Sequence, residues 1–268
     1  MDGNRKTEKD VLIQLGRNMT PICLENILFD YGNTLLLDPF VSILRTKANE
    51  AIQVIEAEGM KLERKELIRA WIQANNETDY PYISHFYQEE KIIQNLLKEL
   101  KIPQKSILVN KLLRIYRDGF RESIVTDKES ERTRQLLLSL KSMGLRLGVL
   151  SNERKRFLKI GLSYLCIDDI LDFALSSEEL GIEKPKVEFY QTALAMLHLI
   201  PEKTLYVGDD PSRDIMPAAR AGLKTVLCLQ PRKYSTPWRD YDCQKTVKAD
   251  FTINKLSELH TVLDRISR

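Results

Sequence analysis

The stretch Asn26-Ile27-Leu28-Phe29-Asp30-Tyr31-Gly32-Asn33-Thr34-Leu35 decides the fold of this chain. Its apolar run is closed by a glycine-containing turn, which predicts a buried strand that ends at Asp30. In open α/β sheets, ligands bind at the carboxyl edge of the strands, where such a residue lies. A single acid at the end of a strand is common as a turn cap, so Asp30 alone does not establish a site.

Three later segments add polar side chains to the ends of apolar runs or to a helix break. One run leads to a hydroxyl and an amide, another leads to paired carboxylates, and between them a lysine precedes a proline. These residues are Ser151 and Asn152, then Lys184 before Pro185, then Asp209, Asp210 and Asp214. Each has an ordinary structural explanation, such as a cap, a surface lysine or a turn. Their joint presence makes coincidence improbable.

The rest of the chain divides into a helical part and an alternating part. From 39 to 126, apolar residues recur at three- and four-residue spacing, which predicts four or five helices. After residue 130, strands alternate with helices, which predicts an α/β fold with a doubly wound parallel (Rossmann-like) sheet. We expect this core over 25–38 and 127–268, an inserted all-helical unit over 39–126, and an N-terminal extension over 1–24. The extension is either a short helix or a disordered leader.

The composition narrows the class of protein. The 268 residues carry a formal net charge of +3 and are 43% hydrophobic and 29% charged, which indicates neither a nucleic-acid nor a membrane partner. No apolar run approaches the roughly 18 residues of a membrane span, and the polar start of the chain lacks the apolar core of a signal peptide. We therefore expect a cytoplasmic protein. Its widely spaced cysteines are expected as buried reduced thiols, namely Cys23, Cys166, Cys228 and Cys243.

The ordered set of polar residues resembles the haloacid dehalogenase-like (HAD) hydrolase superfamily over roughly residues 26–262. In this resemblance Asp30 is the nucleophile, Ser151 the second-motif hydroxyl and Lys184 the third-motif lysine, with Asp209 and Asp214 as the fourth-motif acids. The helical unit resembles the cap inserted after the first motif in part of the superfamily. The resemblance implies a Mg²⁺-dependent hydrolase of small phosphorylated metabolites that forms an aspartyl-phosphate intermediate. A homodimer stays open.

The resemblance also implies a ligand set for metal and phosphate. Mg²⁺ would be held by Asp30, Asp209 and the backbone carbonyl of Gly32, while Asp214 or Asp210 would hold a metal-bound water or orient Lys184. The phosphate would meet hydroxyl, amide and backbone donors, namely those of Lys184, Ser151, Asn152, Asn33 and Thr34. In the helical unit, His85 belongs to a polar and aromatic cluster. That cluster either lines the pocket or packs on the cap.

One residue departs from the family pattern. Phosphatases of the superfamily usually carry a second Asp two residues after the nucleophile, and here that position is Gly32. General acid–base catalysis by that second Asp is worth roughly 10²–10⁴-fold in rate. The chain either uses another donor such as His85, Tyr31 or water, or acts on good leaving groups, or does not hydrolyse phosphates. The alternatives are a metal-independent 2-haloacid dehalogenase and a catalytically weak regulatory or scaffold protein, although the three acids at 209, 210 and 214 favour a retained metal site.

Overall fold

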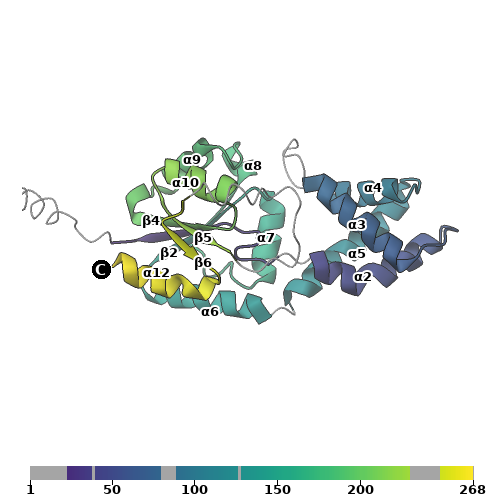
Figure 1. Ribbon diagram of the computed structural model, residues 1–268, viewed down its shortest axis with the longest axis horizontal. Coiled ribbons are helices and arrows are strands. Elements are labelled where there is room, and N and C mark those ends of the chain that lie inside the picture. The colour runs from purple at the N-terminus through teal and green to yellow at the C-terminus, as the bar shows by residue number, and fades with distance from the viewer. Residues whose placement is uncertain (1–22, 38–39, 80–88, 126–127, 230–247, 268) are drawn as a thin grey trace, which may run out of the picture.

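The structure is a computed structural model that describes residues 23–37, 40–79, 89–125, 128–229 and 248–267. At its centre lies a parallel sheet of six strands in the order β3-β2-β1-β4-β5-β6 (Figure 1). The strands are β1 Asn26–Phe29, β2 Arg146–Ser151, β3 Phe173–Ser176, β4 Thr204–Gly208, β5 Lys224–Cys228 and β6 Phe251–Ile253. The doubly wound α/β core predicted from the sequence is confirmed.

Different helices cover the two faces of the sheet (Figure 1). Along β1, Ile27 and Phe29 belong to one hydrophobic cluster and Leu28 to another, because successive side chains of a strand point to opposite faces. One face is covered by α6 Lys128–Ser142, α7 Lys155–Tyr164 and α12 Leu259–Ile266, and the other by α8 Ser177–Leu180, α9 Val187–Leu197 and α10 Met216–Arg220. Burial on both faces explains why β1 reads as an unbroken apolar run.

Four helices between the first and second strands form a unit with its own hydrophobic core. They are α2 Phe40–Glu56, α3 Arg64–Asp79, α4 Glu89–Glu99 and α5 Ser106–Val125. Trp71 is fully buried in this cluster, where its ring lies 6.4 Å from that of Tyr116. The predicted helical signal between 39 and 126 thus corresponds to four helices in the described residues, packed beside the sheet (Figure 1).

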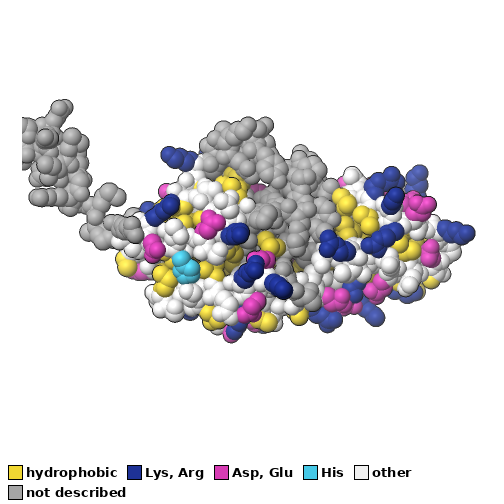
Figure 2. Space-filling model, turned by 60° about the horizontal axis from the view of Figure 1, so that its bottom comes forward, with side chains coloured by type: hydrophobic (Ala, Val, Ile, Leu, Met, Phe, Trp, Pro, Cys, Tyr) yellow, Lys and Arg dark blue, Asp and Glu magenta, His cyan; other side chains and the backbone are white. Residues whose placement is uncertain are grey.

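The helical unit touches the α/β core through α5 and α7. The guanidinium of Arg117 lies 5.8 Å from the centre of the Phe157 ring, and its Nε donates to Glu89 Oε2 at 2.7 Å. Phe120 packs against the hydrophobic clusters of both units. The surface of the helical unit carries basic and acidic side chains interspersed on the face seen in Figure 2. Among the described residues, aromatic rings thus take part in the contact between the two units.

One helix begins irregularly, and one local prediction was wrong. A wide, π-type turn over Pro211–Ile215 precedes α10. Pro217 lacks the N–H that a regular helix would donate to the carbonyl of Arg213, so the turn widens there. The cysteines were expected to be buried; Cys228 is buried, whereas Cys23 and Cys166 are exposed.

Several predictions fall outside the described residues. They are the extension before residue 23, His85 and Cys243. Among the described helices, none combines the length and the apolar character needed to cross a bilayer.

Candidate active site

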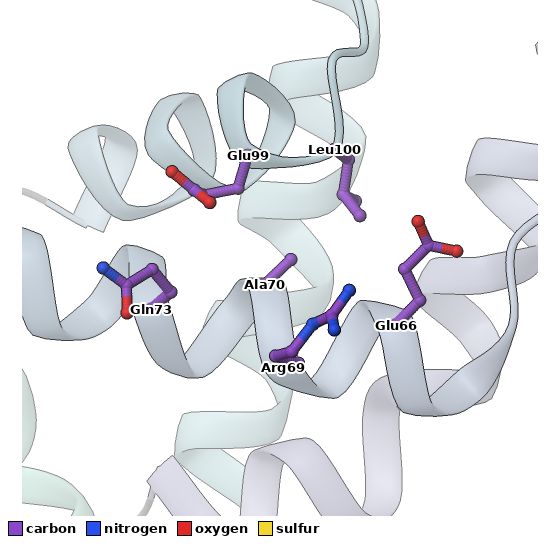
Figure 3. Close-up of a pocket in the computed structure, with 6 residues that line it drawn as sticks. All are labelled: Glu66, Arg69, Ala70, Gln73, Glu99 and Leu100. Carbon is purple, nitrogen blue, oxygen red and sulfur yellow. The ribbon is translucent and has the colours of Figure 1, made fainter.

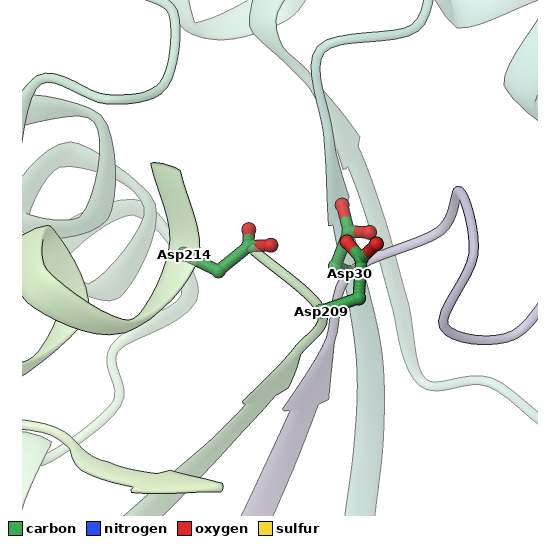
Figure 4. Close-up of side chains that lie close together, drawn as sticks. All are labelled: Asp30, Asp209 and Asp214. Carbon is green, nitrogen blue, oxygen red and sulfur yellow. The ribbon is translucent and has the colours of Figure 1, made fainter. Parts of the chain in front are cut away.

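Three carboxylates meet at the carboxyl edge of the sheet. Phe29 of β1 is in register with Val207 of β4, so Asp30 and Asp209 leave neighbouring strand ends, and Asp214 returns to the same point from the following turn. One oxygen of each carboxylate lies within 4.8 Å of the others (Figure 4). All three residues are at most 9% exposed. Negative charges this close and this buried repel one another, so the cluster needs a cation.

Lys184 supplies one positive charge to this cluster. Its Nζ donates to Asp30 Oδ1 at 2.6 Å, Asp214 Oδ1 at 2.9 Å and Tyr206 Oη at 2.7 Å. An ammonium has three N–H groups, so these contacts use its whole donor capacity. Burial alone would lower the pKa of Lys184, but the charges of Asp214 and Asp30 outweigh it and raise that pKa. The lysine is therefore a permanent cation inside the site.

The same crowding disfavours the charged form of Asp30. The pKa of its carboxyl is raised from 3.8 to about 7: burial raises it most, Lys184 lowers it, and the charges of Asp214 and Asp209 also raise it. Its Oδ2 accepts a long hydrogen bond from Thr34 Oγ1 at 3.3 Å. One ammonium thus does not compensate three acids, which leaves the site short of positive charge.

Both carboxylate oxygens of Asp214 accept hydrogen bonds. Its Oδ1 accepts from Lys184 and from Tyr206 at 3.0 Å, and its Oδ2 accepts from the backbone N–H of Asp210 at 3.1 Å. Both oxygens therefore already hold the lysine and the turn in place. This arrangement fits the expectation that Asp214 orients Lys184, and it makes Asp30 and Asp209 the better candidates for direct metal ligands.

Two buried tyrosines support Asp214, and neither was predicted from the sequence. Tyr190 donates to the carbonyl of Arg213 at 2.7 Å. Its ring lies edge-on against Tyr206, with centres 5.0 Å apart. Burial and the charge of Asp214 raise the pKa of Tyr206, which keeps its hydroxyl protonated. A tyrosine inside the apolar run of β4 was the available signal, because a buried hydroxyl requires a partner.

Gly208 makes room for Asp214 at the end of β4. A Cβ on Gly208 would lie 2.5 Å from the Cβ of Asp214 and 2.6 Å from its Cγ. No real side chain tolerates such a contact, so the acid can reach the sheet edge only beside glycine. The glycine before the paired acids is therefore a structural requirement of the carboxylate cluster.

Asn152 holds Lys184 through the backbone. Its Oδ1 accepts from the Lys184 N–H at 2.9 Å, and its Nδ2 donates to the Lys184 carbonyl at 3.1 Å. The side chain was predicted to bind phosphate, but in this structure both ends of its amide bind the backbone of Lys184. Ser151 is buried at the end of β2, where its Oγ accepts from the N–H of Glu153 at 3.0 Å.

Other predicted site residues are used locally. Asp210 Oδ1 accepts from the backbone N–H groups of Ser212 and Arg213 at 2.9 and 3.0 Å, so it caps the turn and stands outside the group of three acids. The N–H of Asn33, expected as a phosphate donor, donates to the Leu36 carbonyl at 2.6 Å. The turn itself uses these groups, and the metal role of the Gly32 carbonyl stays a prediction.

A separate hollow lies on the helical unit. It has a volume of about 290 Å³ and is lined by Glu66, Arg69, Ala70, Gln73, Glu99 and Leu100 from α3 and the end of α4 (Figure 3). Its polar side chains are of mixed charge. None of the acids of the sheet edge lines it, so it forms no part of the candidate active site.

Comparisons with known proteins place the chain among hydrolases of this architecture. Residues 74–228 match the family model described as haloacid dehalogenase-like hydrolase. The chain is 27% identical over 251 residues to the glyceraldehyde 3-phosphate phosphatase of Methanocaldococcus jannaschii, covering 91% of this chain and 99% of that relative. It is 29% identical over 143 residues to the pyrophosphatase PpaX of Bacillus mycoides, covering 52% of this chain and 62% of that relative.

A solved structure shares the fold over most of the chain. It is that of YfnB from Bacillus subtilis, which was assigned as a HAD hydrolase and crystallised bound to magnesium. Its TM-score is 0.64 at 19% identity, with 90% of this chain and 99% of that chain covered. At this identity the likeness supports the fold alone.

Replacing the central carboxylate is expected to stabilise the metal-free protein. Below about pH 4, Asp30 is protonated in both states, and as pH rises to about 7 the unfolded state loses its proton first. The penalty for burying the charge is therefore fully present above pH 7. In EDTA, Asp30→Asn should melt at least about 2–4 °C above wild type at pH 8, the shift that 1 kcal/mol produces in a chain of this size. The difference should vanish near pH 4. A lower melting temperature of the variant at pH 8 would contradict this charge balance.

Loss of the amide that holds Lys184 is expected to reduce turnover more than stability. Asn152→Ala removes two hydrogen bonds worth about 0.5–1.5 kcal/mol each, and a shifted Lys184 should lower kcat at least about tenfold. The control is Asn26→Ala, which removes a buried amide that donates to Thr204 Oγ1 at 3.2 Å, at the opposite end of β1. Melting curves and kcat are measured on both variants. Equal effects on kcat would show that the amide of Asn152 serves only the fold.

The close approach at Gly208 predicts a costly alanine. Gly208→Ala should lower the free energy of unfolding by about 1–3 kcal/mol, because Asp214 or the strand must move. Gly32→Ala is the matched control, since a Cβ there would meet no described atom within 4 Å. Urea unfolding of both variants checks the difference. Equal free energies of unfolding for the two variants would mean that the turn carrying Asp214 moves aside without loss of stability.

Proposed function

The chain belongs to the haloacid dehalogenase-like hydrolase family, and we propose that it is a Mg²⁺-dependent phosphatase of small phosphorylated molecules. The observation that carries the proposal is the group of three buried carboxylates around one ammonium, Lys184. The relative named glyceraldehyde 3-phosphate phosphatase, covered along 99% of its length, supports the phosphatase class. Asp30 is the proposed nucleophile, and a homodimer stays a prediction.

The donor set suits a hard divalent cation. Carboxylate oxygens are the ligands that Mg²⁺ prefers, and one or two carboxylates commonly suffice beside waters and substrate phosphates. Asp30 and Asp209 would hold the ion directly, with Asp214 acting through water or through Lys184. When bound, the ion would neutralise charge on the acids and on the phosphate. The raised pKa of Asp30 supports this requirement, because the cluster lacks positive charge without it.

The chain's own residues would position the two anions that react. Lys184 holds Asp30 Oδ1 at 2.6 Å and Thr34 contacts the other oxygen, so the carboxylate keeps one orientation. An oxygen of Asp30 attacks phosphorus, the bond to the leaving oxygen breaks, and an aspartyl phosphate forms. Water then attacks phosphorus in that acyl phosphate, the Oδ–P bond breaks, and the carboxylate is restored. The ammonium of Lys184 offsets the repulsion between carboxylate and phosphate throughout.

The geometry disfavours the two alternatives. A dehalogenase that works without metal gains nothing from three clustered acids, which cost stability when they are buried together. A scaffold needs neither the acids nor the buried lysine. Three residues of this chain position the acids or the lysine, which supports a catalytic site. They are Gly208, Tyr206 and Asn152.

Metal binding and turnover test the proposal together. Mg²⁺ should raise the melting temperature of wild type by mass action, by an amount that corresponds to about 2.7 kcal/mol at 100 times the dissociation constant. Asp209→Asn should lose most of that shift. The control Asp172→Asn should keep it. Asp172 directly precedes β3 and binds Lys141 and the N–H of Leu147, so it lies away from the carboxyl ends of the strands.

Turnover is measured as phosphate release from a panel of phosphorylated compounds. EDTA should abolish release, Mg²⁺ should restore it, and Asp30→Asn should remove it while the fold persists. Halide release from a 2-haloacid without metal would support the dehalogenase instead. Absence of both a thermal shift and turnover would support the scaffold.

A further inference from the structure

Gly32 has no structural reason to be glycine. Its backbone does not adopt the left-handed conformation that favours glycine, and a Cβ there would meet no described atom within 4 Å. The other described glycines differ, because each has either a positive φ or a close neighbour, as Gly222 and Gly208 do. A side chain at the position two residues after the proposed nucleophile would therefore meet no steric clash and would require no backbone strain. An acid would fit there, and the sequence does not provide one.

Three described proton donors near Asp30 are already committed. Lys184 uses its three N–H groups on Asp30, Asp214 and Tyr206, and the hydroxyl of Tyr206 itself donates to Asp214. The hydroxyl of Tyr190 also lies deep in the core and donates to a backbone carbonyl. None of these groups is available to a leaving group without breaking the network that positions the nucleophile.

Tyr31, considered above as a substitute acid, is directed away from this chemistry. It is 5% exposed, and a Cβ on Gly161 of α7 would lie 1.8 Å from its hydroxyl oxygen, so the hydroxyl is packed against that helix. Burial, together with the charge of Glu153, raises the pKa of Tyr31 and makes it a weaker acid. The residue next to the nucleophile thus belongs to the hydrophobic core.

We propose that the site cleaves phosphates whose leaving group departs as a stable anion, namely acyl phosphates, phosphoric anhydrides or aryl phosphates, much faster than alkyl esters. The inference rests on the proposed phosphatase function and adds the class of bond that is cleaved. A carboxyl group with a pKa of about 4 or a phenol with a pKa of about 10 leaves without a proton far more readily than an alcohol. An alkyl ester would release an alkoxide, which needs a proton from an acid, and Gly32 has no side chain to supply that proton.

The bond changes balance without an acid from the enzyme. The Oδ–P bond to Asp30 forms as the P–O bond to the leaving group breaks, and the electron pair stays on the leaving oxygen as carboxylate, phosphate or phenolate. Water then attacks phosphorus and the Oδ–P bond breaks, with its electron pair returning to Asp30. One proton of the water stays on the new phosphate oxygen, and the other passes to a phosphate oxygen or to bulk water.

The test is a leaving-group series with Mg²⁺ present: acetyl phosphate, pyrophosphate, 4-nitrophenyl phosphate, phenyl phosphate and glycerol phosphate. We measure kcat/KM as phosphate release, with Asp30→Asn as the blank for spontaneous hydrolysis. Wild type should cleave the compounds with acidic leaving groups at least about 10²-fold faster than glycerol phosphate. Gly32→Asp should raise the ratio of glycerol phosphate cleavage to acetyl phosphate cleavage by up to roughly 10²–10⁴-fold. Gly32→Asn, of the same shape without an acidic proton, should not raise this ratio.

The outcomes separate this inference from the proposed function. Hydrolysis of the whole series at similar rates would overturn the inference and leave the phosphatase intact. The same follows if the series is flat in wild type and becomes steep in His85→Ala, because a donor from the helical unit would then replace the acid. No hydrolysis of any compound would overturn both.

Discussion

The site depends on one buried ammonium that must hold together groups that repel one another. Lys184 reaches Asp30 and Asp214 with short bonds, while Asp209 stands within the same cluster. Breaking a buried pair by removing one partner costs several kcal/mol, because the remaining charges stay buried. The lysine therefore fixes the orientation of Asp30, the proposed nucleophile, and limits the repulsion, but it cannot neutralise three acids. The deficit of positive charge makes this edge of the sheet suited to a further cation.

Several features of the fold act through that ammonium. Asn152, on the loop after β2, binds the backbone of Lys184 on both sides of its Cα, so two separate segments are held together by one side chain. A π-type turn carries Asp214, and Tyr190 binds a carbonyl within that turn. Gly208 lets the same turn approach the strand. Each of these residues constrains where one of the charged groups lies.

Much of this arrangement could be predicted from the sequence, and the rest could not, for physical reasons. Apolar runs ending in acids gave the strands and their ends, because a strand buried on both faces leaves little ambiguity. The order of the acids and the lysine predicted which side chains converge. The sequence did not indicate that Asp210 would cap a turn or that Asn152 would bind the lysine loop, because an amide or a carboxylate can serve a backbone as well as a ligand. Tyr206 was missed because an aromatic residue in a buried strand is usually read as core packing.

Gly32 changes how selectivity can arise in such a site. An enzyme with a positioned acid accelerates cleavage of any ester that fits, so its choice of substrate depends on contacts with the body of the molecule. Without the acid, the barrier itself distinguishes substrates, because each tenfold loss in rate corresponds to about 1.4 kcal/mol of unassisted leaving-group departure. Alkyl phosphates would be rejected by a factor of roughly 10²–10⁴ with no contact to the alkyl group at all. The helical unit is then free to bind its substrate loosely, since the bond at phosphorus already determines which molecules react.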